Sequence, residues 1–177
     1  TAIEQNTPLA DHLESELGVE IDLETTADYA GLVQAMTAGE VDIAYFGGVS
    51  YVLAHERSDT RAFAVGEQDG VTEWDSVFIA HEDTGIEAMA DLRTGTDTDL
   101  VLGDPLSTTG SVMPTYYANR RFDVDFESDL ESYTHVGAHD AVLRTVSNGD
   151  ADVGALNGRI FDAAVQAGDT DSVRVLW

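Results

Sequence analysis

The sequence predicts an α/β fold in which a mostly parallel sheet carries helices on its faces. Segments with apolar residues at helical spacing alternate with short runs of strand length along the 177 residues. Hydrophobic residues make up 43% of the chain, and acidic residues are spread through the periodic segments rather than gathered in blocks, which excludes a disordered acidic tail. Repeated strand and helix units favour parallel pairing. The length allows one ordinary domain or two small lobes.

The first 65 residues contain three helical patterns, each followed by a strand-like run. Leu9, Leu13 and Leu17 mark one face of the first helix, which Gly18 ends. Gly39 ends the second helix in the same way. We expect helices at 9–17, 28–38 and around 49–53, and strands at 19–23, 41–46 and 61–65.

A polar stretch at 66–73 separates these elements from a longer series. Apolar runs at strand length again alternate with helical patterns, and Pro105 stops one of the strands. The expected strands are 75–80, 99–102, 132–136, 152–156 and 173–176. The expected helices are 86–92, 111–121, 138–148 and 158–166.

The composition narrows the classes of partner. With 34 acidic residues, eight arginines and no lysine, the formal net charge is -26, which argues against nucleic acid and anionic membranes as partners. The same composition suggests a salt-adapted (halophilic) protein, because at about 1 M salt the Debye length falls to roughly 3 Å and carboxylates barely repel one another. Cysteine is absent, which excludes disulfides and thiolate metal sites. No apolar run approaches the roughly 20 residues that cross a bilayer.

The most informative segment is Gly-Asp-Pro-Leu-Ser-Thr-Thr-Gly at 103–110. It joins the end of a strand to three consecutive hydroxyl residues, Ser107, Thr108 and Thr109, at the start of a helix. Free backbone N–H groups and the positive end of the helix dipole meet there, so the segment is suited to bind a phosphate-like anion. Ordinary capping is the competing interpretation for any one of these hydroxyls.

Four expected strand ends share one character. Each joins small residues to a side chain that can recognise or stack on a ligand, and ligands of such sheets bind at the carboxyl ends of strands. The four segments are 46–48 with Phe46, 103–110 with the three hydroxyls, 136–139 with His139, and 156–159 with Asn157 and Arg159.

The motifs together resemble the substrate-binding proteins of phosphate, phosphite and phosphonate ABC transporters. The matching segments are VDIAYFG at 41–47, SYVLA at 50–54, GDPLSTTG at 103–110 with Pro114 behind it, GAHD at 137–140, NGDADVGA at 148–155 and VRVLW at 173–177. The resemblance covers essentially the whole chain. It implies a binding component that is not an enzyme, needs no cofactor and works with a membrane permease and an ATPase. Such a component would be extracellular, at the cell surface, either lipid-anchored or secreted.

The resemblance also implies a two-lobed periplasmic-binding-protein-like fold of type II, in which each lobe is a mostly parallel sheet flanked by helices. Lobe 1 would comprise 1–73 and 173–177, and lobe 2 would comprise 74–172. The two crossings would lie near 73–74 and 172–173, and the lobes would close on the ligand. Family members normally begin before Thr1 and continue well past Trp177, so the chain is expected to be trimmed at both ends.

The resemblance assigns roles at matching positions. Ser107, Thr108 and Thr109, the last replacing the more usual Ser, would hold the oxyanion through hydroxyls and backbone N–H groups. His139 would donate to the same oxygens and could become cationic beside an anion, whereas the alternative is a helix-capping surface histidine. Phe46 stands where several members carry Tyr.

Tyr45 and Tyr51 are candidates for the hydroxyl contact that Phe46 lacks, or else buried core aromatics. Trp74, at the first crossing, would offer its indole N–H or line the cleft. Family members that bind an aminoalkyl phosphonate tend to carry a carboxylate near the position of Arg159, where it pairs with the amine of the ligand. A guanidinium there would repel an amine. The expected ligand is therefore phosphate, phosphite or a simple alkylphosphonate. The alternative for Arg159 is a surface ion pair.

The sequence also allows three other interpretations. A hydrolase would use Ser107 and His139 with Asp104 or Asp140, but no nucleophile-elbow pattern surrounds Ser107. A metal site from His135, His139 and Asp140 lacks the spacing of one helical face. A sensory ligand-binding domain of the same fold stays open, because the lobes of a sensor and of a transporter component have the same sequence pattern.

Overall fold

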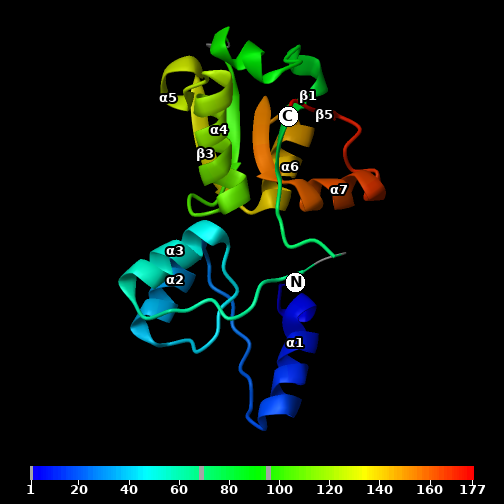
Figure 1. Ribbon diagram of the computed structural model, residues 1–177. Coiled ribbons are helices and arrows are strands. Elements are labelled where there is room, and N and C mark those ends of the chain that lie inside the picture. Colours follow the sequence, from blue (N-terminus) through cyan, green and yellow to red (C-terminus); the bar gives the residue numbers. More distant parts are fainter. Residues whose placement is uncertain (1, 68–69, 95–96) are drawn as a thin grey trace.

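A computed structural model describes residues 2–67, 70–94 and 97–177 of the chain. One part is a five-stranded sheet with helices on both faces, and the other is a group of three helices joined by extended segments (Figure 1). The polar stretch at 66–73 connects the two parts, and its positions 68 and 69 lie outside the described residues.

The sheet confirms all five strands expected after residue 74. They are β1 Ser76–His81, β2 Asp99–Gly103, β3 Ser132–Gly137, β4 Val153–Asn157 and β5 Val173–Val175. Their order is β3-β2-β4-β1-β5. The strand β2 pairs in parallel with β3 and β4, whereas β1 runs antiparallel to β4 and β5. The sheet is therefore mixed rather than uniformly parallel.

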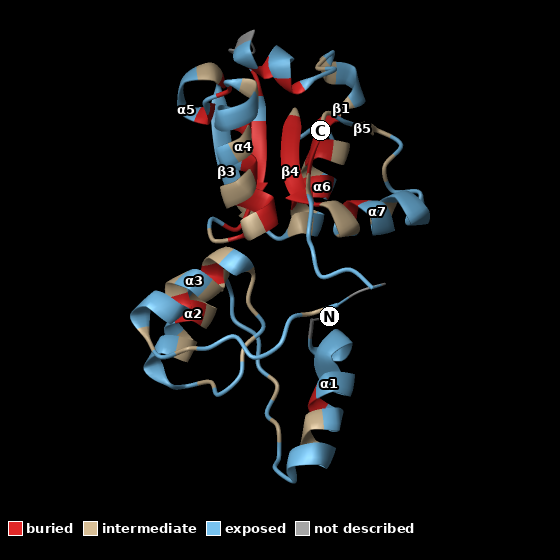
Figure 2. Ribbon diagram, viewed as in Figure 1, coloured by how far each residue is buried: buried red, intermediate tan, exposed pale blue. Residues whose placement is uncertain are grey.

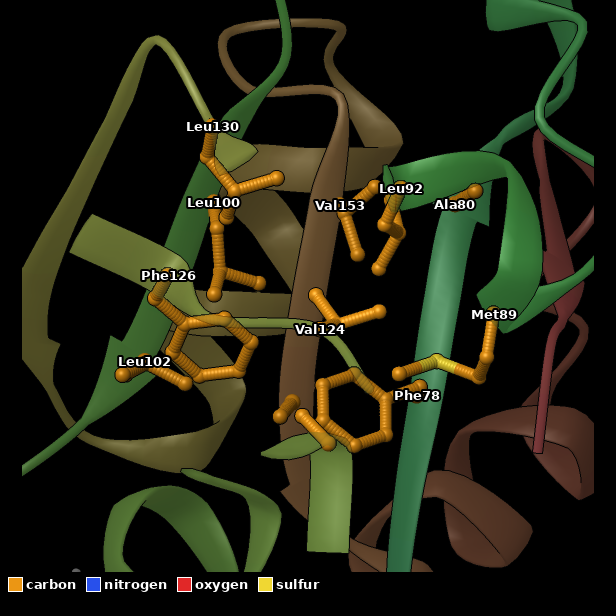
Figure 3. Close-up of a cluster of buried hydrophobic side chains, with 12 residues drawn as sticks. Phe78, Ala80, Met89, Leu92, Leu100, Leu102, Val124, Phe126, Leu130 and Val153 are labelled. Carbon is orange, nitrogen blue, oxygen red and sulfur yellow. The ribbon is translucent and has the colours of Figure 1, made fainter. Parts of the chain in front are cut away.

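The central strands are buried on both faces, which explains their continuous apolar runs (Figure 2). Successive side chains point to opposite faces, so Phe78 and Ile79 belong to two different core clusters. The first cluster is drawn in Figure 3 and includes Leu100, Leu102 and Val153. The second contains Val101 and the helix residues that cover the opposite face.

Helices cover both faces of the sheet. The first face carries α4 Met113–Phe122 and the short α5 Phe126–Asp129, and the second carries α6 His139–Ser147 and α7 Gly158–Ala167. The helix expected at 86–92 is instead a 3-10 turn at Met89–Thr94. Among the side chains of this turn that the structure describes, those of Met89 and Leu92 reach the core. Two buried side chains are enough to hold one short turn.

The first part of the chain contains α1 Ala2–Leu17, α2 Tyr29–Ala38 and α3 Gly48–Arg57. The three strands expected at 19–23, 41–46 and 61–65 are wrong, because these segments are extended but make no ladder among the described residues. An alternating pattern favours a strand only where a second strand satisfies its backbone groups. Apolar side chains such as Ile43, Phe63 and Val65 accordingly stay exposed.

The structure shows one mixed sheet, which is part of the two-lobed arrangement expected from the resemblance. Residues 173–175, expected to belong to the first lobe, pair with β1 at the edge of this sheet. Trp177 lies beyond β5, but its carbonyl accepts the N–H of Phe78 at 2.8 Å. The division into lobes stays a prediction.

Replacing Gly154 by Ala tests the fit between β4 and α6. A Cβ there would lie 2.7 Å from Cγ1 of Val142 and 2.8 Å from Cγ2 of Val146, so the helix has to shift. We expect a loss of about 1–3 kcal/mol in the free energy of unfolding, measured by urea denaturation. Gly48→Ala is the matched control, because its Cβ would make only ordinary contacts with Thr108. Equal stability of the two variants would contradict this packing.

Candidate anion-binding site

The hydroxyl segment forms a buried turn between β2 and α4. Ser107 caps a π-helical turn at Thr108–Val112, and its Oγ accepts the N–H of Gly110 at 3.1 Å. The N–H of Val112 bonds back to the carbonyl of Ser107 at 3.0 Å, which is the wider spacing of a π turn. Such turns occur often at functional sites. Ser107 and Thr109 are 2% and 8% exposed, so their hydroxyls lie below the protein surface.

His139 packs against this turn from the start of α6. A Cβ on Gly110 would lie 2.7 Å from Cε1 of His139, so glycine is needed for the ring to come this close. The Nδ1 atom of His139 accepts the N–H of Asn157 at 3.2 Å, which requires Nδ1 to be unprotonated. The proton of the neutral ring is therefore on Nε2, which lies 3.4 Å from Oγ of Ser107 and donates to it.

The charge state of His139 follows from this environment. Burial lowers the pKa of His139, and the opposing effect of Asp140 is smaller. Both the hydrogen bonding and the lowered pKa favour a neutral ring. A cationic ring beside a bound anion stays a prediction. His139 is half-buried and contacts the hydroxyl turn, so it is not a surface capping residue.

Asn157 connects Thr109 to the start of α7. Its Oδ1 accepts the N–H groups of Arg159 and Ile160 at 3.0 and 3.3 Å, which caps the helix. Its Nδ2 donates to Oγ1 of Thr109 at 3.2 Å. One buried amide therefore holds two of the four strand ends in a fixed relation.

Helices of the first part contact the hydroxyl turn directly. The Oγ1 of Thr108 accepts the N–H of Val49 in the first turn of α3 at 3.0 Å. The N–H of Tyr29, at the start of α2, donates to Oδ2 of Asp104 at 3.2 Å. Burial raises the pKa of Tyr29, whose side chain also hydrogen-bonds Ser107. Both N-termini therefore face the turn that carries the three hydroxyls.

Tyr29 and Asp104 also belong to this cluster, and the sequence pattern did not place either of them at the anion site. Asp104 is 6% exposed, and its Oδ1 accepts the N–H of Leu106 at 2.8 Å. Tyr29 follows the N-cap residue Asp28 directly. A search for every helix N-terminus with an adjacent hydroxyl side chain would have found it.

The aromatic candidates of the first part lie elsewhere. Tyr45 is 68% exposed, with its hydroxyl against Gly66. The hydroxyl of Tyr51 accepts the N–H of Ala62 at 3.3 Å, and its ring stacks on His55. Phe46 is half-buried before the start of α3. The structure does not bring Tyr45 or Tyr51 into a hydrogen bond with the hydroxyl turn.

Arg159 and Trp74 form a separate pair at the first crossing. The Cζ atom of Arg159 lies 4.7 Å from the centroid of the Trp74 ring, within the range of a cation–π contact. The Nη2 atom of Arg159 donates to the carbonyl of Val71 at 3.3 Å. The guanidinium thus packs on the connecting segment 71–74.

The geometry does not support a catalytic triad. In a triad a carboxylate accepts the Nδ1 proton of the histidine, whereas Nδ1 of His139 itself accepts a backbone N–H. His135 hydrogen-bonds Ser111 at 3.0 Å instead of joining His139. Within the described ranges no group of three acidic or histidine side chains is arranged to hold a metal ion.

Residues 1–177 match the protein family described as "ABC transporter, phosphonate, periplasmic substrate-binding protein". The chain belongs to this family. It is 32% identical over 160 residues to the phosphonates-binding periplasmic protein of Escherichia coli, covering 89% of this chain and 47% of the relative. It is 28% identical over 181 residues to the phosphate-import protein PhnD of Mycolicibacterium smegmatis, covering 96% of this chain and 56% of the relative. The chain therefore spans about half the length of these family members.

Solved structures of similar proteins support the same fold. A binding protein component of an ABC phosphonate transporter from Pseudomonas aeruginosa gives a TM-score of 0.87 at 24% identity, covering 99% of this chain and 59% of that one. PhnD1 from Prochlorococcus marinus, solved with methylphosphonate, gives 0.86 at 22% identity, covering 98% and 65%. The described part of the chain therefore has the fold of type II periplasmic binding proteins.

No helix within the described ranges is long and apolar enough to span a bilayer.

Replacing His139 by Gln tests the neutral state of the ring. Burial lowers the folded-state pKa below the ordinary value of about 6.5, so the unfolded chain binds the extra proton first. The contribution of the neutral ring to the free energy of unfolding is therefore complete above about pH 6.5, and it is lost as the pH falls toward the folded-state pKa.

We expect the wild type to lose more unfolding free energy than His139→Gln between pH 7.5 and pH 5, measured by urea denaturation. His12→Gln is the matched control, because His12 is exposed on α1. A parallel decline of wild type and His139→Gln would show that His139 does not carry this dependence.

Proposed function

We propose that this chain belongs to the substrate-binding component of an ABC importer and captures a phosphorus oxyanion. The observation that carries the proposal is the convergence of Ser107, Thr108 and Thr109 with His139 beyond the carboxyl ends of β2 and β3. Family membership supports it, and so does the methylphosphonate bound to the similar PhnD1 structure. A permease and an ATPase would receive the ligand, and the component would work outside the cytoplasmic membrane.

The donors around the turn suit an oxyanion. Backbone N–H groups at the start of the π turn, the hydroxyls and the Nε2–H of His139 can all donate, and the helix dipole favours negative charge. The contacts of Thr108 with Val49 and of Ser107 with Tyr29 join the two parts of the chain directly. An anion entering here would exchange these contacts for bonds to its own oxygens, so that ligand bridges the two parts.

The preferred ligand has no cationic tail. Arg159 lies two residues after Asn157, whose amide donates to Thr109, and its guanidinium would repel an amine carried by a ligand at the turn. The net charge of -26 disfavours anions at long range, and we propose that the protein is salt-adapted, so that high salt screens this repulsion.

A thermal-shift panel tests the ligand class. Phosphate, phosphite, sulfate, methylphosphonate and 2-aminoethylphosphonate are compared at low and molar NaCl. A ligand at 100 times its Kd stabilises the folded state by about 2.7 kcal/mol, and we expect this for a phosphorus oxyanion in both salts. Ser107→Ala should abolish the shift, whereas Ser128→Ala, at an exposed position on α5, should keep it. Stabilisation by none of the phosphorus anions would reject the proposal.

Replacing Arg159 by Glu tests the specificity. The substitution supplies a carboxylate for an amine, so we expect 2-aminoethylphosphonate to gain at least tenfold in affinity relative to methylphosphonate, measured by calorimetry. Arg144→Glu, which changes an exposed arginine of α6, is the matched control. An unchanged ratio in Arg159→Glu, or tighter binding of 2-aminoethylphosphonate by the wild type, would contradict the role of Arg159.

A further inference from the structure

A cavity lies beside the sheet, apart from the three hydroxyl residues. Its volume is about 520 Å³, which is within the size range of small-molecule sites. It lies between α4, α5 and the edge strand β3, and neither Ser107 nor His139 lines it. Leu102 and Val124 form an apolar floor and belong to the core cluster of Figure 3.

The cavity exists because α4 and the turn before it place small polar residues over the edge strand β3. Ser111, Thr115 and Asn119 are four residues apart and therefore share one helix face. Their side chains are too short to fill the space above β3. Since β3 is the edge of the sheet, its side chains Tyr133 and His135 stay exposed on the other side of the cavity.

Three rings form one wall. The centroids of Phe126 and Tyr133 are 6.0 Å apart, and those of Tyr133 and His135 are 6.2 Å apart. The hydrogen bond of 3.0 Å between Nε2 of His135 and Oγ of the buried Ser111 fixes the end of this row. The π faces of aromatic rings attract organic cations, and the attraction is strongest where water is excluded.

The rim of the cavity is negatively charged, which also favours a cation. Asp125 and Glu127 line the cavity and are exposed, and among the described lining residues none is an arginine. The Oδ1 atom of Asp125 caps α5, which holds this carboxylate in place. An anion would meet two carboxylates in a chain of net charge -26, so the cavity repels the ligand class proposed for the hydroxyl turn.

We propose that this cavity binds a small organic ammonium ion. Methyl or methylene groups of the cation lie on the apolar floor, its charge faces the Phe126, Tyr133 and His135 rings, and Asp125 and Glu127 hold it at the rim. A bare inorganic cation would leave the apolar floor unused, and a neutral ligand would gain no attraction from the two carboxylates.

Choline and 3,3-dimethylbutan-1-ol form a matched pair of probes. They have the same shape, but a carbon atom replaces the charged nitrogen in the second. In titrations at constant ionic strength, followed by amide NMR, we expect choline to shift the signals of 133–135 and 125–127 in a saturable manner. The alcohol should bind at least tenfold more weakly. Equal binding of the two probes, no saturation, or shifts that map elsewhere would overturn the proposal.

Two substitutions assign the effect to the cavity. Glu127→Gln and Tyr133→Leu should each weaken choline binding at least threefold. Glu131→Gln removes an exposed carboxylate that does not line the cavity and should change it less than twofold. An equal loss in Glu127→Gln and Glu131→Gln would mean unspecific attraction to an acidic surface. Methylphosphonate binding should be unaffected by Glu127→Gln, so this test and the test of the oxyanion site fail independently.

Discussion

The approach of His139 to Gly110 is the contact on which the site depends. With no side chain on Gly110, the imidazole reaches Ser107, while its other nitrogen is held by the backbone of Asn157. Three strand ends are therefore tied together by one neutral ring. Because each of these groups is at least half-buried and hydrogen-bonded, none rotates freely, and the donors keep their directions before any ligand arrives.

The same polar cluster sets how the two parts of the chain meet. Their contacts at the turn are hydrogen bonds, from Val49 to Thr108 and from Tyr29 to Asp104, rather than a shared apolar core. Hydrogen bonds between surfaces exchange readily with those of water or of an anion, at a net value of about 0.5–1.5 kcal/mol each. An interface of this kind suits parts that separate and rejoin.

The centre of the sheet was predictable because β1, β2 and β4 are nearly continuous apolar runs of strand length. The hydroxyl turn was predictable because Ser107, Thr108 and Thr109 are neighbours in sequence. The extended segments before residue 66 were not, since strand formation depends on a partner that no local pattern reveals. The pairing of Arg159 with Trp74 and the contact of Tyr29 with Ser107 join residues far apart in the chain, and composition and periodicity carry no record of such contacts.

The antiparallel pairing of β1 with β5 places the start and the end of the sheet part side by side. The polypeptide therefore enters and leaves this part at neighbouring points, as it does in a domain inserted into a surface loop of another protein. A short linker between residues near 76 and 177 would close it into a ring without crossing the core. The sheet part is thus suited to circular permutation, with new termini at the exposed positions 82 and 83 of the turn after β1.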